Sequence, residues 1–332
     1  MKEKAVFKNA KWMIYSRIIQ MLIGLVVSML SARYLGPSGF GIINYAASLT
    51  SFFVPFMQLG FNSILVQEIV LNEEKEGEIL GTSLGLSLIS SILCIVSIVG
   101  LVNFVNPGDK ITGLICFLHS LMLIFQAFDL FQYWFQAKLL SKYTSIISIL
   151  AYVVVSAYRL YILATAKSVY WFSIWEVIDY FLIGIGVLIA YKKLGGRRLK
   201  FSAKLIKSLL GKSKHYILSN SMVHILAITD KIMLKFWVSD FDLGCYSAAV
   251  TCAGLTSFIF GAIIDSTRPL IFENKTKDEK KYKQSLTSLY SVINLLSLLQ
   301  SIAMVIFSDL IIYILYGSEY VLSASLEGVT PP

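Results

Sequence analysis

Several ionisable side chains stand inside long apolar runs of this 332-residue chain. They are four cations and three acids: Arg17, Arg159, Lys231, Lys235, Glu176, Asp179 and Asp230. On insertion scales a charged side chain at the bilayer centre costs about 2.5–3.5 kcal/mol, so such residues indicate function unless a surface or a partner explains them. Guanidinium and ammonium groups suit phosphate oxygens, and buried carboxylates suit protons, Na⁺ or a neighbouring cation. None of this requires covalent chemistry, so we expect no catalytic residues.

The four cations differ in the depth at which they should lie. At about 1.5 Å per helical residue, Arg17 falls in the inner half of its run, and Arg159 and Lys231 fall in the outer half. The side chain of Arg17 can extend to the inner surface, and that of Lys235 to the outer surface. Arg159 is therefore the cation that is hardest to explain without an anionic ligand, whereas Lys231 has Asp230 beside it as a partner.

The acids allow two interpretations. Glu176 and Asp179 are three residues apart, so they share one face of a helix. Together with Asp230 they form a candidate site for a coupling ion. Alternatively, they pair with Arg159 or Lys231, and charge pairing is the interpretation that we favour.

Uncharged polar residues inside the apolar runs are weaker indicators of a functional site than charged ones. Asn44, Gln58 and Asn62 occupy one apolar run, where they either line a polar cavity or form hydrogen bonds to neighbouring helices. The three histidines and four cysteines are scattered without ligand spacing. We therefore expect no metal site, no disulfide framework and no cofactor.

The composition places these residues in a membrane protein. Hydrophobic residues make up 56% of the chain and charged residues 15%, and the mean hydropathy is +0.72. Soluble domains usually contain about 45–50% apolar and about 25% charged residues, so this composition excludes an ordinary soluble enzyme. The net charge of +9 is concentrated in short segments between apolar runs. It indicates membrane topology, and we expect no nucleic-acid partner.

Apolar runs of spanning length recur along the whole chain. They cover roughly 12–34, 42–65, 79–105, 111–135, 145–165, 169–191, 216–237, 244–264 and 288–315, and a tenth begins near 320. With the N-terminus in the cytoplasm, 22 of the 29 Lys and Arg fall in inner segments and three in outer segments, as the positive-inside rule requires. We expect an all-α, multi-pass protein with a cytoplasmic N-terminus.

A short internal repeat divides the chain into two halves. Residues 40–46 read FGIINYA, and 203 positions later residues 243–249 read LGCYSAA. The shift spans six runs, so the two halves keep the same orientation and form a parallel repeat about the membrane normal. We predict a six-helix lobe over 1–191, a basic linker over 192–215 and a partial second lobe over 216–332, from which about two helices are missing.

The linker itself is basic and partly apolar. Residues 192–214 read KKLGGRRLKFSAKLIKSLLGKSK. The apolar residues have near-helical spacing, which predicts an amphipathic helix on the inner membrane surface. The alternative is a solvated basic loop.

Motifs at the ends of the runs carry a family resemblance. They are Asn9 and Trp12, ARYLGPSGFG at 32–41, LG at 59–60, QEI at 67–69, DKIML at 230–234, GCYSAA at 244–249 and YGSEY at 316–320. In this order and spacing the chain resembles the polysaccharide-biosynthesis flippases, which are the O-antigen and capsule repeat-unit translocases of the multidrug/oligosaccharidyl-lipid/polysaccharide exporter superfamily.

The resemblance implies a bacterial inner-membrane protein with two pseudo-symmetric helical lobes around a cavity. Such proteins flip an undecaprenyl-diphosphate-linked oligosaccharide between leaflets by alternating access. The implied partners are this lipid-linked oligosaccharide, membrane lipids and other polysaccharide-assembly membrane proteins. One alternative is a multidrug or cation antiporter of the same superfamily. A polysaccharide polymerase is a weaker alternative, because it should carry a long outer loop.

Overall fold

The structure is a computed structural model that describes residues 2–105, 107–254 and 279–320 and the single positions 260, 263, 267 and 271. At the start of the chain it describes the backbone, but not the side chains, of residues 2–11, 13, 14 and 17. The end of the predicted eighth run and the run near 320 lie outside the described residues. The described residues form helices and no strands, so the all-α fold class is confirmed.

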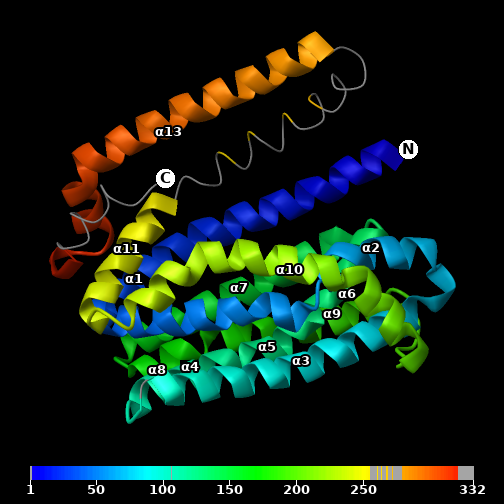
Figure 1. Ribbon diagram of the computed structural model, residues 1–332, viewed down its shortest axis with the longest axis horizontal. Coiled ribbons are helices and arrows are strands. Elements are labelled where there is room, and N and C mark those ends of the chain that lie inside the picture. Colours follow the sequence, from blue (N-terminus) through cyan, green and yellow to red (C-terminus); the bar gives the residue numbers. More distant parts are fainter. Residues whose placement is uncertain are drawn as a thin grey trace. The chain divides into compact units, whose positions relative to one another are not determined.

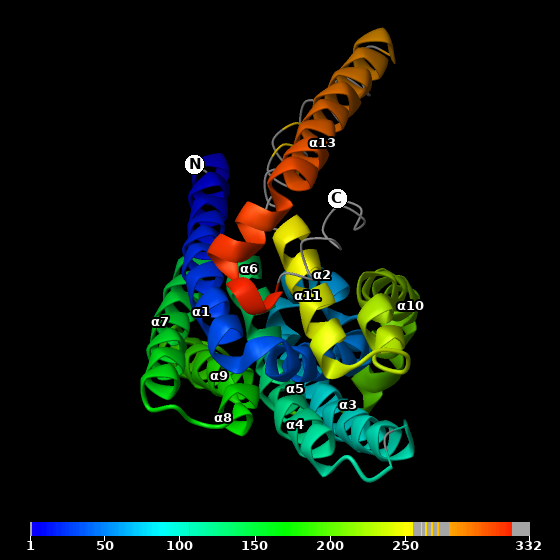
Figure 2. The ribbon, with the colours of Figure 1, turned by 90° about the vertical axis from the view of Figure 1, so that its left-hand side faces the viewer.

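The chain divides into two compact units. The first contains residues 1–35 and 42–238, and the second contains residues 36–41 and 239–332. The helices of the first unit lie side by side as a bundle (Figures 1 and 2). Its strongest packing joins α7 to α9, α2 to α6, α5 to α9 and α3 to α4.

The first unit is built from a long kinked helix followed by shorter ones. Its elements are α1 (Lys2–Gln58), α2 (Phe61–Leu71), η1 (Glu73–Lys75), α3 (Glu76–Val105), α4 (Lys110–Ser120), α5 (Met122–Gln126), η2 (Ala127–Asp129), α6 (Leu130–Ala137), α7 (Ser141–Ala164), α8 (Val169–Ser173), α9 (Trp175–Lys193) and α10 (Ala203–Leu234). The described elements of the second unit are α11 (Asp240–Gly254), α13 (Glu279–Leu315) and η3 (Ser318–Tyr320).

Seven helical stretches of the described residues are long and apolar enough to cross a bilayer. One of them covers the first two predicted runs, because α1 continues through a break at Gly36, where φ is +66°. Glycine adopts this left-handed conformation without the steric penalty of a side chain. A second break at Leu59 and Gly60 interrupts the predicted 42–65 run. The fourth run is also divided, into α4, α5, η2 and α6.

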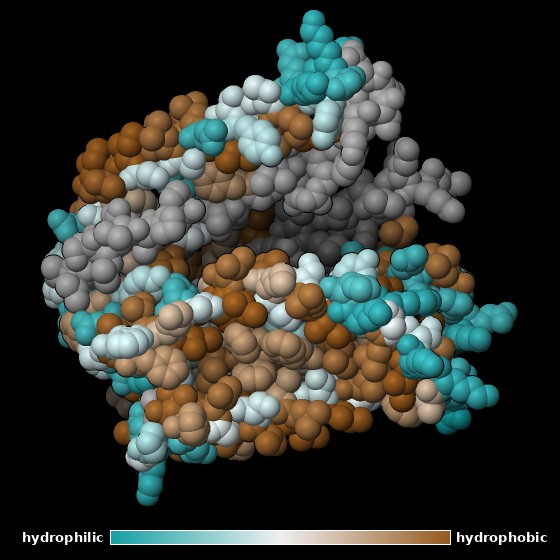
Figure 3. All heavy atoms as spheres, viewed as in Figure 1, coloured by the Kyte–Doolittle hydropathy of each residue, from teal (hydrophilic) through white to brown (hydrophobic). Residues whose placement is uncertain are grey.

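Large apolar side chains cover the outside of the bundle. Ile92, Leu93 and Val96 of α3 are more than half exposed, and such a surface suits lipid rather than water. In Figure 3, brown apolar side chains form a broad band, and hydrophilic residues gather at the end of the bundle where α2 meets α3. The multi-pass membrane character is thus visible in the structure as well as in the composition.

The basic linker differs from the predicted surface helix. Helix α9 continues to Lys193, residues 196–202 have no regular secondary structure, and α10 then runs unbroken from Ala203 to Leu234. We call residues 196–202 the strap. It follows a row of glycines on α3, with Lys200 N donating to the Gly77 carbonyl at 3.1 Å and Ser202 N donating to Thr82 Oγ1 at 3.0 Å. The close backbone approach explains why this segment is not helical.

Replacing Gly81 by alanine should displace the strap. A Cβ there would lie 2.5 Å from the Lys200 carbonyl oxygen and 2.8 Å from its nitrogen, so the hydrogen bonds on either side, each worth about 0.5–1.5 kcal/mol, should weaken. Thermal unfolding of the purified chain in detergent is the measurement. Gly100→Ala on the same helix is the matched control, because a Cβ there meets nothing within 4 Å and helix propensity favours alanine. We expect a lower Tm for G81A and an equal or higher Tm for G100A; equal shifts would contradict this account.

Candidate functional site

Arg159 is buried within the first unit although it carries a permanent charge. It lies on α7 and is 8% exposed. Its Nη2 donates to Ser31 Oγ of α1 at 3.0 Å, and its Cζ lies 4.6 Å from the centre of the Trp175 ring. Its Nε has no hydrogen-bond acceptor among the described residues. The guanidinium is held by a hydroxyl and an aromatic face while it keeps a free donor, which suits an anionic oxygen.

Glu176, at the start of α9, has a partner that the sequence pattern did not single out. His119 of α4 places Nε2 at 3.4 Å from Glu176 Oε2, and its Nδ1 lies 3.3 Å from Thr50 Oγ1 of α1. The charge of Arg159 also acts on Glu176. At 3.4 Å the His–Glu contact is longer than a well-formed hydrogen bond. The one available signal was that His119, like the acids, interrupts an apolar run.

Asp179 lies one turn further along α9. Its Oδ1 is buried and has no hydrogen-bond partner among the described residues. Beside it, Tyr180 accepts a hydrogen bond at its hydroxyl oxygen from Gln126 Nε2 at 3.1 Å. Glu176 and Asp179 therefore share a face, as predicted from their spacing, but their surroundings differ: one carboxylate has a histidine, and the other does not.

A polar chamber of about 170 Å³ opens within the same unit. Its walls come from α1, η2, α6, α7 and α9: Ser16, Gln20, Asp129, Gln132, Thr144, Ser145, Ser148, Ile183 and Val187. Only the last two are apolar, and Asp129 supplies a carboxylate. A water molecule occupies about 30 Å³ in the liquid, so the chamber has room for a few waters. The sequence did not reveal it, because its walls come from four separate runs.

The two lysines lie on α10 and just after it. The charge of the adjacent Asp230 acts on Lys231. Lys235 Nζ lies 5.6 Å from the centre of the Tyr45 ring. Burial acts to raise the pKa of Asp109, but hydrogen bonds from Thr112 and the charge of Lys235 outweigh it and lower that pKa below its usual range.

The three uncharged polar positions predicted to line a cavity have different surroundings in the structure. Asn62 accepts a hydrogen bond from Asn220 Nδ2 of α10 at 3.1 Å, so it joins two helices. Asn44 and Gln58 are partly buried on α1. The side chain of Arg17 lies outside the described part of the chain. Ser31 and Trp175 contact Arg159, whereas Asp230 acts on Lys231, so the two cations have different neighbours.

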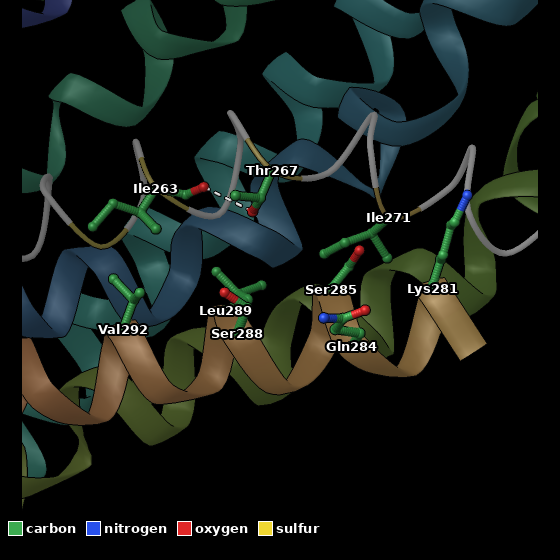
Figure 4. Close-up of a pocket in the computed structure, with 9 residues that line it drawn as sticks. All are labelled: Ile263, Thr267, Ile271, Lys281, Gln284, Ser285, Ser288, Leu289 and Val292. Atoms are coloured by element: carbon green, nitrogen blue, oxygen red, sulfur yellow. Dashed lines mark hydrogen bonds between the residues drawn. The ribbon is translucent and has the colours of Figure 1, made fainter. Parts of the chain in front are cut away.

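The second unit contains a larger groove of about 540 Å³ (Figure 4). It lies between the described positions 263, 267 and 271 and the first turns of α13. Thr267 donates to the Ile263 carbonyl at 2.9 Å, and Lys281, Gln284 and Ser285 project from α13 along the groove. None of the predicted site residues lines it.

Comparison with known proteins places the chain in a family. Residues 6–275 match the family described as polysaccharide biosynthesis protein. The chain belongs to this family. No curated protein matches it. The polysaccharide biosynthesis family was the one expected from the motifs at the ends of the runs, so that resemblance is confirmed.

Solved structures with a similar fold include a membrane transporter. It is described as the inward-facing conformation of a multidrug resistance MATE family transporter of the MOP superfamily. The TM-score is 0.65 at 14% identity, over 94% of this chain and 77% of that chain. A likeness at this identity establishes the fold of this polysaccharide biosynthesis protein and leaves its cargo to be argued from the site.

Proposed function

We propose that the protein flips an undecaprenyl-diphosphate-linked oligosaccharide repeat unit across the bacterial inner membrane by alternating access. The N-terminus and the basic segments lie on the cytoplasmic side in this proposal, as the Lys and Arg distribution favours. The sugar–diphosphate head crosses through a hydrated path, and the prenyl chain stays in lipid.

Arg159 is the observation that carries the proposal. A permanently charged group at 8% exposure is costly in an apolar bundle unless it is used. Ser31 and Trp175 hold the guanidinium, and among the described residues the charge of Glu176 also acts on it without forming a direct ion pair. A diphosphate is the ligand class for which arginine's planar set of donors is best suited.

A multidrug or cation antiporter is the second candidate. The half-buried carboxylates of Glu176, Asp179 and Asp129 favour it, because acidic side chains attract a cationic cargo. A polymerase is less well supported: the connections 106–109, 165–168 and 235–239, which are outer in the proposed topology, are short and leave no space there for a catalytic loop.

Complementation of a strain that lacks its own repeat-unit flippase tests the proposal. We expect the chain to restore surface glycan, scored by gel profile, without changing tolerance to cationic drugs. Raised drug tolerance without surface glycan would favour the antiporter and overturn the proposal. Membrane insertion of the tagged chain is checked for both the glycan and the drug-tolerance measurements, so that absence of expression is not interpreted as absence of activity.

A further inference from the structure

Two glycines in the second unit make matching close approaches to the backbone. A Cβ on Gly41, just after the turn at 36–40, would overlap the carbonyl oxygen of Asp240, at the start of α11. A Cβ on Gly244 of α11 would overlap the carbonyl oxygen of Pro37, in that turn. Each glycine therefore lets the opposing main chain approach more closely than any other residue would allow.

The two contacts are related by the internal repeat. Adding the 203-residue shift to Pro37 gives Asp240, and adding it to Gly41 gives Gly244. One copy of the repeat supplies a glycine where the other supplies a carbonyl, and the reverse holds at the second contact. This is the reciprocal pattern of a two-fold interface, in which residue i meets j and j meets i. The weak sequence match thus corresponds to a self-complementary contact.

The surroundings of the contact are dry. Leu243, Cys245 and Ser247 have no exposed surface. The Phe40 ring packs against Tyr316 and Tyr320, with centroid distances of 6.1 and 6.2 Å. The two glycine contacts are backbone on backbone, and the Phe40 ring is the side chain that leaves Tyr316 and Tyr320 when they separate. Such an interface can close tightly and open again.

We propose that these paired glycine–carbonyl contacts are an outer seal, which closes the path toward the periplasm and separates in the outward-facing state. The proposal rests on the alternating access proposed above and on the topology, which places residues 35–41 and 238–244 on the outer side. The proposal names Gly41 and Gly244 as the two residues whose contacts close the outer side. It also explains the repeat, because only a symmetric pair of glycines permits both approaches at once.

Alanine at either glycine tests the seal through a native thiol. Cys245 is fully buried next to Gly244, so a membrane-impermeant maleimide added to spheroplasts should label it slowly. If the outward-open state is a minor state of about 1–10%, Gly41→Ala and Gly244→Ala should each raise the labelling rate about tenfold by favouring it. Peptide mapping by mass spectrometry separates Cys245 from the other three cysteines.

Gly113→Ala on α4 and Gly254→Ala on α11 are the matched controls, because a Cβ at either position meets nothing within 4 Å. Helix propensity favours alanine at all four positions, so only the contact distinguishes test from control. Labelling of G41A and G244A at the control rate would overturn the seal. This readout needs no cargo, so it can succeed even where complementation fails.

A second arm covers the case in which the alanine variants do not fold. Phe40→Cys and Tyr320→Cys are joined by a short thiol cross-linker that contains a reducible disulfide. Glycan export should stop on cross-linking and return on reduction. Export that continues in the cross-linked protein would show that this contact never opens, and the proposal would be wrong.

Discussion

Arg159→Gln should reduce glycan export by about 10–150-fold, which corresponds to the loss of a hydrogen bond to a charged group worth about 1.5–3 kcal/mol. Glutamine keeps an amide donor on a shorter side chain. What it lacks is the positive charge over Trp175 and the donor at Nε. The measurement is surface glycan per inserted copy in the complemented strain.

The controls for Arg159 separate charge from geometry. Arg159→Lys keeps the charge but loses the planar donor set, so it should recover only part of the activity. Lys110→Ala removes one positive charge at an exposed position outside the site and should leave export unchanged. Full export by R159Q, with normal insertion, would remove the diphosphate-binding role of this residue.

The sequence was informative wherever a feature is set by one segment. Apolar runs predicted the spanning helices, since each run must satisfy its own backbone in lipid. The break at Gly36 follows from a Gly-Pro turn between two runs. The repeat shift of 203 relates the Gly41 and Gly244 contacts, although the sequence match alone was only a few residues long.

Features that depend on several segments were not predictable in this way. The polar chamber combines side chains from four runs, and the position of His119 next to Glu176 depends on how α4 packs near α9. The strap is not helical because α3 presents Gly77 and Gly81 to it, whereas the apolar residues that predicted a helix in the linker lie mostly after residue 203, where α10 is helical. In each case a tertiary neighbour overrides the local pattern.

The surroundings of Glu176 and Asp179 bear on whether these acids bind a coupling ion or only pair with neighbouring charges. Glu176 has both His119 and the charge of Arg159 nearby, so pairing explains it in the state shown. Pairing does not explain Asp179, whose Oδ1 is buried without a partner among the described residues. A buried histidine in contact with Glu176, with the buried Oδ1 of Asp179 one turn further along α9, is an arrangement that can exchange a proton.

Glu176→Gln combined with Asp179→Asn should therefore abolish the dependence of transport on a pH gradient. A gradient of one pH unit can drive about tenfold accumulation per proton exchanged, because about 1.4 kcal/mol corresponds to a factor of ten. The double variant should transport at its gradient-free rate whether or not the gradient is imposed. Flux of a fluorescent lipid-linked oligosaccharide into proteoliposomes, with and without the gradient, is the measurement.

Glu68→Gln is the matched control for this experiment. Glu68 is a buried carboxylate that Lys212 Nζ binds at 2.7 and 2.9 Å, and it joins α2 to α10 away from the site. Its loss should lower thermal stability and leave the gradient response intact, which a general effect of removing a buried acid would not do. If the double variant keeps a full response to the pH gradient and to a Na⁺ gradient, Glu176 and Asp179 are structural charge partners, and coupling must be sought at another carboxylate, of which Asp129 in the polar chamber is the next to test.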